Sequence, residues 1–347
     1  MELGGQSLVR NCPTHSKIKI ILLISYSPVI PWGHPQQPRT PRFQSARPAR
    51  LPNGQMMSKS PLDGSPDRIV FESGDVCVGA FRCATDHPLF RNSGPSSHYC
   101  FVFPRTAVII RHGNTRIVAD PNIVTLYNRA QEYGREPLSD RGDNCEWYGV
   151  SPRLLREALS ARDPRAANEE QRPIRFTHAS IDAAVYLAQR QLYRRVVAGD
   201  AEALCVEETV VALLDAVLAS AYGSRGPDET SGRRIRDLVH DVQCVLHRHV
   251  AEPLGLADIA RLTDTSMFHL CRCFRLVTGM TLHEYRTQLR LRGSLEALEA
   301  GDPDLTRVAL DGGFSSHSHF TAAFRRAFGA TPSWIRAYLR EGSCHAR

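Results

Sequence analysis

Lysine is almost absent from this chain of 347 residues: it occurs only at Lys17, Lys19 and Lys59, and every other basic side chain besides histidine is arginine. The formal net charge is +7. That charge suits a polyanionic partner but is weak evidence for one, because many basic proteins bind nothing acidic. Arginine makes bidentate contacts with phosphate and with guanine edges. A GC-rich genome produces the same arginine bias, so composition alone leaves a nucleic-acid partner open.

The sequence also lacks the cysteine pairs of zinc ribbons and disulfide scaffolds. Its ten cysteines are scattered, and the closest two, Cys271 and Cys273, are two apart on a predicted helix, where they point to different faces. We therefore expect reduced thiols in a cytoplasmic protein. No apolar run is long enough for a membrane helix. The stretch from Lys17 to Trp32 begins like a signal peptide, but it is too short and too interrupted to cross a membrane.

Regular periodicity is missing from the first part of the chain. Residues 1–66 hold ten of the 22 prolines, and a pair of methionines, Met56 and Met57, stands just before regular patterns begin. We expect residues 1–57 to be an extension that is disordered or was never translated, and residues 1–55 to be dispensable.

Short segments rich in β-branched and aromatic residues fill residues 68–151 and are separated by Gly, Pro, Asp and Asn. This pattern predicts a small barrel or sandwich in a β domain that covers residues 58–160. A helix closes the domain, with Ser151 as its N-cap and Pro152 at its first position. The predicted strands are RIVFES, DVCVGAFRC, YCFVFP, AVIIRH, TRIVAD, NIVTLYN and CEWYGV.

Residues 161–222 contain an expected helical hairpin. Apolar residues recur at spacings of three and four over 180–197 and 201–221, and Gly199 and Asp200 form the turn between them. The hairpin is too short to bury both apolar stripes within itself, so we expect residues such as Leu213 and Val217 to mediate homodimerisation. A linker follows over residues 223–234.

The last part of the chain contains an internal repeat of about 50 residues. IARLTDTSMFHLCRCFRLVTGMTLHEYR and VALDGGFSSHSHFTAAFRRAFGATPSWIR align Ala260 with Ala309, Phe274 with Phe324, and Gly279 with Gly329 after one inserted residue. Each copy reads as a short helix, a turn, a Ser-capped second helix and a glycine stop, which is the pattern of a helix-turn-helix motif.

With these motifs, residues 235–342 resemble the DNA-binding domain of AraC/XylS-type transcription regulators. The resemblance implies a multidomain α+β protein: a cupin-like β-barrel with a helical hairpin, then an all-α domain with two helix-turn-helix motifs. Three positions depart from the family pattern. Asp264 replaces the usual turn glycine, Gly255 replaces a Ser or Thr cap, and Ala322 stands where a contact arginine is common.

The resemblance and the motif geometry together assign roles in DNA recognition. The exposed first turn of a recognition helix meets base edges, and arginines farther along reach phosphates. Phe268 suits a thymine methyl group, and Arg272 suits a guanine. The expected base-contacting residues are Ser266, Met267, Phe268, Cys271, Arg272, Ser316, His317, Ser318, His319 and Thr321; the expected phosphate-contacting residues are Arg275, Arg325, Arg326 and Arg336.

The leading hypothesis is a sequence-specific regulator whose partners are double-stranded DNA, RNA polymerase, a small-molecule effector in the barrel and a second copy of the chain, with no membrane. A purely structural barrel is one alternative. A metal-dependent cupin enzyme fused to a DNA-binding module is another, and it needs clustered ligands. His87, His98 and His112 occur without the HxH…E pattern, and His317 and His319 have no third ligand at helical spacing. We therefore expect no catalytic residue, metal or cofactor.

Overall fold

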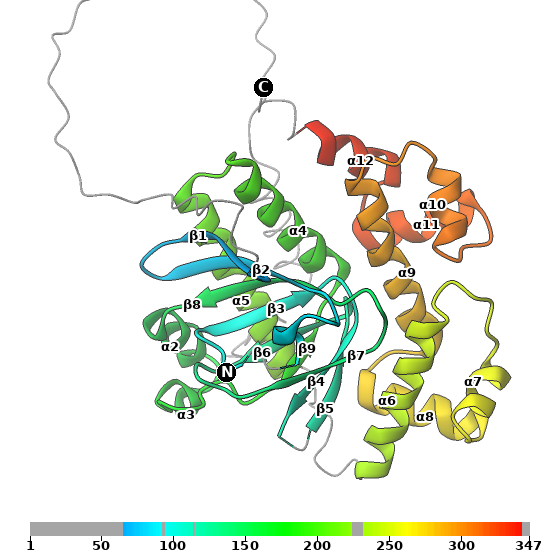
Figure 1. The fold of residues 1–347 in the computed structure, drawn as a ribbon, viewed down its shortest axis with the longest axis horizontal. Coiled ribbons are helices and arrows are strands. Elements are labelled where there is room, and N and C mark those ends of the chain that lie inside the picture. The colour runs from blue at the N-terminus through cyan, green and yellow to red at the C-terminus, as the bar shows by residue number, and fades with distance from the viewer. Residues whose placement is uncertain (1–64, 92–93, 114, 224–231, 342–347) are drawn as a thin grey trace, which may run out of the picture.

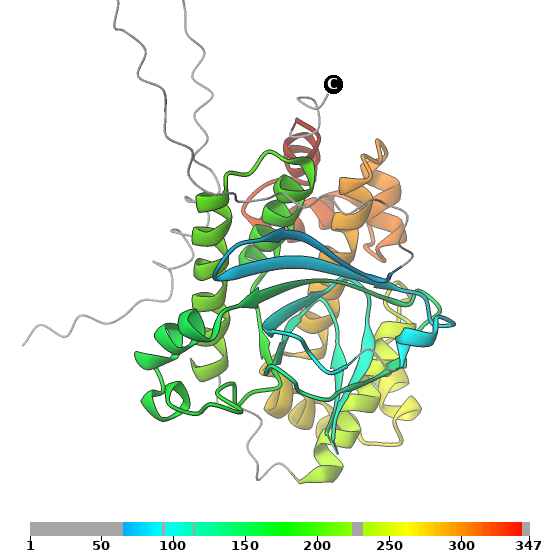
Figure 2. The same ribbon diagram turned by 60° about the vertical axis from the view of Figure 1, so that its left-hand side comes forward.

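The computed structural model describes residues 65–91, 94–113, 115–223 and 232–341, so both the predicted extension and its signal-like stretch lie outside it. The chain forms a sheet domain, a two-helix hairpin and a helical C-terminal region (Figure 1). Figures 1 and 2 show the long helix α9 (Leu282–Glu299) passing between two clusters of C-terminal helices, alongside the sheet domain. Within the described residues, none of the helices combines the length and apolarity that a bilayer crossing requires.

The larger sheet has six strands, each paired antiparallel to its neighbour. Successive side chains of a strand point to opposite faces. In β8 (Asp143–Val150), Cys145 and Trp147 therefore belong to one apolar cluster, whereas Glu146 and Tyr148 lie on the other face. There, Tyr148 Oη donates to the carbonyl of Gln189 in the hairpin. The strand order is β1 (Asp67–Glu72), β2 (Val76–Cys83), β8 (Asp143–Val150), β3 (Tyr99–Pro104), β6 (Ile123–Tyr127) and β9 (His178–Ser180).

A smaller sheet of three antiparallel strands packs against the larger one. Val108 and Ile110 of this sheet share an apolar cluster with Cys100 and Trp147 of the larger sheet. In the described part of the chain the two sheets are hydrogen-bonded separately. The domain therefore consists of two packed antiparallel sheets, and the predicted closed barrel is not seen. The strand order is β5 (Thr115–Ala119), β4 (Val108–His112) and β7 (Gly134–Pro137).

All seven strand segments predicted from the sequence are strands. The prediction missed β7 and β9, because four and three residues are too few to show an alternating pattern. The predicted helix at the end of the domain is confirmed: Ser151 Oγ accepts from the Leu154 N–H at 3.2 Å. The short helices are η1 (Pro88–Phe90), α2 (Pro152–Ser160) and α3 (Pro164–Ala167).

The helical hairpin consists of α4 (Ala183–Ala198) and α5 (Ala203–Gly223), and the turn residue Gly199 has φ 76°. The expectation that Leu213 and Val217 stay uncovered was wrong, because both are 0% exposed. They belong to a large apolar cluster that also contains side chains of the larger sheet and of the C-terminal helices. The exposed large apolar side chains of the hairpin are Val197, Leu204 and Val211.

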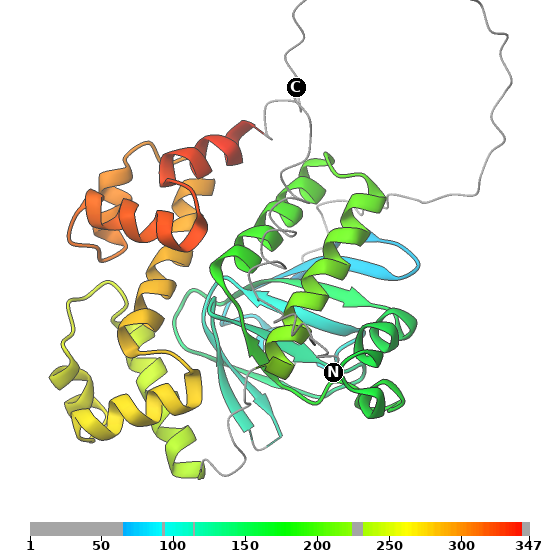
Figure 3. The same cartoon turned by 180° about the vertical axis from the view of Figure 1, so that it is seen from behind.

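Over residues 232–341, all regular secondary structure is helical, as predicted. Two helix pairs lie at opposite ends of α9. We call them module 1, which is α7 (Leu256–Leu262) with α8 (Met267–Thr278), and module 2, which is α10 (Leu305–Asp311) with α11 (His317–Phe328). Seen from behind, α8 and α11 both lie on the near side of α9 (Figure 3). The helices are α6 (Arg233–Arg248), α7 (Leu256–Leu262), α8 (Met267–Thr278), α9, α10 (Leu305–Asp311), α11 (His317–Phe328) and α12 (Pro332–Glu341).

Candidate nucleic-acid interface

Module 1 folds around a tight turn between α7 and α8. Asp264 in this turn has φ 46°, the left-handed conformation that the sequence analysis expected an aspartate to tolerate. Ser266 caps α8, because its Oγ accepts from the His269 N–H at 3.2 Å. Gly279 ends α8 with φ 73°. The cap therefore sets the first turn of α8 at the surface of the module.

Module 2 repeats this construction. Gly313 has φ 78° at the position that matches Asp264, and the space for a Cβ there lies only 2.7 Å from the Ala251 carbonyl oxygen. Glycine is thus required in module 2 for both its backbone conformation and this close approach. Ser316 Oγ accepts from the His319 N–H at 3.1 Å, and Gly329 ends α11 with φ 75°.

One side of each recognition helix forms the core of its module. In α11, Phe320, Phe324 and Phe328 are buried, and the ring centroids lie 5.4 Å apart for Phe320 and Phe324 and 4.5 Å apart for Phe324 and Phe328. In α8, Phe274 is fully buried and makes an edge-to-face contact with Tyr285 of α9 at 5.2 Å. The aromatic residues therefore hold each helix from behind and leave its opposite side free for a ligand.

The predicted base-contacting residues lie on that opposite side. Nine of the ten are exposed, and only Thr321 is half-buried. Phe268 is 79% exposed, so its ring is accessible to a partner. His319 turns back toward its own module, where its Nδ1 lies 3.1 Å from Ser315 Oγ. Cys271 is exposed and Cys273 is buried, as their spacing predicted.

The predicted phosphate-contacting arginines differ in their surroundings. Arg275, Arg325 and Arg326 are exposed, and the last two line a shallow groove with His317 and Thr321. Arg336 is half-buried, and its Nη1 donates to the carbonyls of Asp302 and Pro303 at 2.8 and 2.7 Å.

Module 1 contains the counterpart of this Arg336 contact. Arg286 Nη1 donates to the carbonyl of Leu254 at 2.9 Å, in the loop before α7. Arg286 and Arg336 are equivalent in the repeat, so both fasten the loop that leads into their module. This role was not predicted, although the two arginines align in the repeat at the same offset as Gly279 and Gly329. Contact of Arg336 with phosphate remains a prediction.

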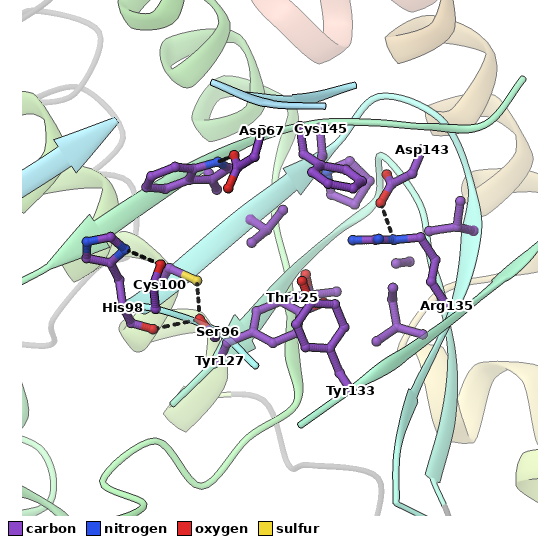
Figure 4. Close-up of a pocket in the computed structure, with 18 of the residues that line it drawn as sticks. Asp67, Ser96, His98, Cys100, Thr125, Tyr127, Tyr133, Arg135, Asp143 and Cys145 are labelled. Atoms are coloured by element: carbon purple, nitrogen blue, oxygen red, sulfur yellow. Dashed lines mark hydrogen bonds and ion pairs between the residues drawn. The ribbon is translucent and has the colours of Figure 1, made fainter. Parts of the chain in front are cut away.

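A cavity of about 100 Å³ lies between the two sheets (Figure 4). Trp147 Nε1 donates to Asp67 Oδ1 at 2.7 Å at one end of it. At the other end the Arg135 guanidinium pairs with Asp143 at 2.5 Å and stacks over the Phe81 ring at 4.3 Å. The wall therefore combines aromatic surface with fixed charges.

The thiol groups in the cavity wall are not reactive nucleophiles. Burial raises the pKa of the Cys100 thiol to about 12, and burial also raises the pKa of Cys145. Both thiols therefore stay protonated at neutral pH. Within the described residues, no group of three or more His, Cys, Asp or Glu side chains could hold a metal ion. His98 instead stacks on Trp147 at 5.6 Å, and His112 Nδ1 bonds to Gln131.

The polar residues of this cavity were not predicted from the sequence. Arg135 lies in a segment that reads as a loop, and Asp143 ends an Arg-Gly-Asp triplet without regular periodicity. Both are buried side chains of strands, and β7 was too short to be predicted.

A family model described as a helix-turn-helix domain matches residues 259–338. The regulatory protein SoxS of Escherichia coli K12 is 32% identical over 102 residues, which are 29% of this chain and 95% of that protein. The Msm operon regulatory protein of Streptococcus mutans is 30% identical over 112 residues, 32% of this chain and 40% of that protein.

Solved structures are also similar. A transcriptional regulator of the AraC type from Chromobacterium violaceum is 27% identical, with a TM-score of 0.29, over 31% of this chain and 96% of that chain. ToxT from Vibrio cholerae is 15% identical, with a TM-score of 0.31, over 72% of this chain and 92% of that chain.

Proposed function

This chain belongs to the AraC/XylS family of transcription regulators and is a DNA-binding regulator, and we propose that its two modules read successive major-groove segments of one duplex. The observation that carries the proposal is the pair of Ser-capped recognition helices with exposed first turns on the same side of α9 (Figure 3). Between them, the 18 residues of α9 span about 27 Å at 1.5 Å per residue. That length suits two recognition helices separated by about one turn of B-DNA, ~34 Å.

The two modules would read bases differently. Module 1 presents Met267 and Phe268, whose apolar surfaces suit thymine methyl groups, together with Arg272, which suits a guanine. Module 2 presents small polar side chains around His317, and Ala322 at the position of Arg272. We expect module 1 to contribute more base discrimination, because a bidentate arginine is the commonest specific contact. Arg275, Arg325 and Arg326 would position the helices through phosphates.

Selection of bound duplexes from a random-sequence library, followed by hydroxyl-radical footprinting on the selected DNA, tests this function. Two protected segments about one helical turn apart, on one side of the duplex, are expected for each protein monomer. A single protected segment, or no enrichment of any sequence, would contradict the proposal that both modules bind successive major-groove segments.

The cavity between the sheets is our candidate for an effector site. Its volume of about 100 Å³ suits a molecule of only a few non-hydrogen atoms in its present shape. We also propose that the sheet domain is cupin-like, and the two sheets that enclose the cavity support this proposal. A regulator that binds the chromosome and RNA polymerase would act in the cytoplasm. The relatives are named as regulatory proteins, and the metal-dependent enzyme alternative finds no support among them.

A homodimer formed through the hairpin remains our proposal, but on a different face from the one first expected. Leu204 and Val211 lie seven residues apart on α5 and are 64% and 41% exposed, and Val197 at the end of α4 is 51% exposed. Positions seven apart share one face of a helix. A second copy of the chain would cover these side chains.

The double variant Leu204→Glu with Val211→Glu is expected to weaken the dimer by roughly 30-fold or more, since it places charges in an apolar contact. Sedimentation velocity at micromolar concentrations measures this. Leu310→Glu is the matched control, because Leu310 is a 55% exposed leucine outside the hairpin. A wild-type chain that is already monomeric at tens of micromolar, or a folded double variant that remains dimeric, would exclude this interface.

A further inference from the structure

The first turn of α8 presents an aromatic ring to the solvent. Phe268 is exposed and is not part of the apolar core of module 1. Leu270 and Phe274 belong to that core and are both 0% exposed. Spacings of two and six residues place them away from Phe268 around a helix of 3.6 residues per turn. The Phe268 ring is therefore not needed to hold α8 in the module and is free to contact a ligand.

Arg272 lies beside this ring on the same face of α8. It follows Phe268 by four residues, a spacing that puts the Cβ atoms of two helical residues about 5–6 Å apart. Both side chains are exposed. Since successive bases of one strand are ~3.4 Å apart along the duplex, the two side chains can reach bases that are one or two steps from each other. The pair thus offers an apolar surface and a bidentate donor to neighbouring base pairs.

The corresponding positions of module 2 carry neither group. Ser318 matches Phe268 and Ala322 matches Arg272 in the repeat, and both are exposed. The recognition helices of the two modules otherwise share their serine cap, their glycine stop and a buried phenylalanine at the matching position. The repeat therefore preserves the frame of the helix and changes this pair of side chains. An aromatic ring beside an arginine is a feature of module 1 that module 2 does not repeat.

A phenylalanine ring recognises one feature of a pyrimidine in the major groove. Thymine presents the O4 acceptor and a C5-methyl group, and cytosine presents the N4 donor at the position of O4. The ring has no side-chain donor or acceptor with which to distinguish O4 from N4, but it buries apolar surface against a methyl group. Cytosine that is methylated at C5 carries its methyl group at the same place as thymine. The ring therefore responds to the methyl group and not to the base that bears it.

The surroundings of Phe268 favour DNA as its partner over an apolar protein surface. Arg272 and Arg275 are exposed on the same helix, and their positive charges complement the phosphates of a duplex. An apolar protein surface that covered the ring would also remove these charges from water without pairing them, which is costly. The ring is thus continuous with the surface that the proposed function assigns to the major groove.

We propose that module 1 reads the C5-methyl group itself, so that 5-methylcytosine is bound as thymine is. The proposal rests on the proposed binding of module 1 in the major groove. Its ligand is a duplex in which a C5-methylated pyrimidine lies one or two steps from a guanine, with Phe268 on the methyl group and Arg272 on the guanine O6 and N7. Methylation of cytosine in such a duplex therefore creates a binding site for this chain.

The test uses the full chain and the duplex that it selects from the random-sequence library. Each thymine of the protected segments is replaced in turn by uracil, which removes one methyl group and leaves the base pairing unchanged. At the position that responds, the T·A pair is replaced by C·G and by 5-methylcytosine·G, and the affinities are measured by titration. We expect the methyl group to tighten binding about four-fold in both comparisons, thymine over uracil and 5-methylcytosine over cytosine, as burial of one such group predicts.

Phe268→Ser gives module 1 the residue that module 2 has at this position. The site is exposed, so the variant should fold, and both affinity ratios should fall to about one. Leu262→Ser is the matched control, because Leu262 is a 51% exposed leucine of α7, outside the recognition helix. Its two ratios should equal those of the wild type.

Ratios of one in both comparisons for the wild type would overturn the methyl reading. A thymine effect without a 5-methylcytosine effect would show that another group reads O4, against the proposed equivalence of the two bases. Ratios that persist in Phe268→Ser would overturn the assignment to this ring. These three outcomes leave the selected duplex bound, so they contradict this inference alone. A wild type that selects no duplex would instead contradict the proposed function, and this inference with it.

Discussion

Phe324→Ala is expected to destabilise module 2 by about 3–5 kcal/mol, the range for deleting a buried phenylalanine ring. Phe324 is 0% exposed and packs between Phe320 and Phe328, so its loss leaves a cavity in the middle of the aromatic row. The loss should appear as faster hydrogen exchange in α10 and α11 and as a lower melting temperature. Binding of the selected duplex should fall with it, because α11 no longer holds its position.

Phe268→Ala is the matched substitution on a recognition helix. Phe268 is 79% exposed, so its removal should leave the melting temperature within error of the wild type. The variant should nevertheless lose preference for the selected duplex if the ring meets a thymine methyl group. Equal melting temperatures for Phe324→Ala and wild type would refute the core assignment. Equal sequence preference for Phe268→Ala and wild type would refute the base contact.

Arg272→Ala is expected to cost about 1–3 kcal/mol on the selected duplex and much less on random DNA, as befits loss of a base contact. Arg325→Ala should weaken binding to all sequences alike and lower the salt slope by about one, because a phosphate contact carries no sequence information. Both side chains are exposed, so neither change should affect folding. Titrations of specific and random duplexes over a range of salt concentrations separate the two cases. Equal losses on both duplexes for Arg272→Ala would contradict its assignment.

The repeat explains why the helices and turns of the two helix-turn-helix motifs could be predicted so closely. Serine caps, glycine stops and an aromatic residue every fourth position act over one or two helical turns. The structure that they produce therefore depends on only a few neighbouring residues. The left-handed turn at Asp264 was predictable for the same reason. The strands of the sheet domain were predictable where they ran for five residues or more, and β7 and β9 were too short.

Contacts between distant segments were not predictable in this way. The pairing of Arg135 with Asp143, and of Arg190 with Glu299, depends on which strands and helices become neighbours. The apolar stripe with Leu213 and Val217 shows the limit most clearly. Its periodicity predicted a buried face, but the partner turned out to be the same chain and not a second copy.

The sequence by itself determined the longer helices, most strands, the duplicated helix-turn-helix motif and the family, because these follow from local backbone preferences and short spacings. The one-turn helices η1 and α3 were not predicted. Only the tertiary structure decided which apolar faces are covered, where the cavity lies and which charges meet along α9. The physical reason is that burial and pairing depend on the distance in space between groups, and groups as far apart in the chain as Arg105 and Glu299 meet only after the chain has folded.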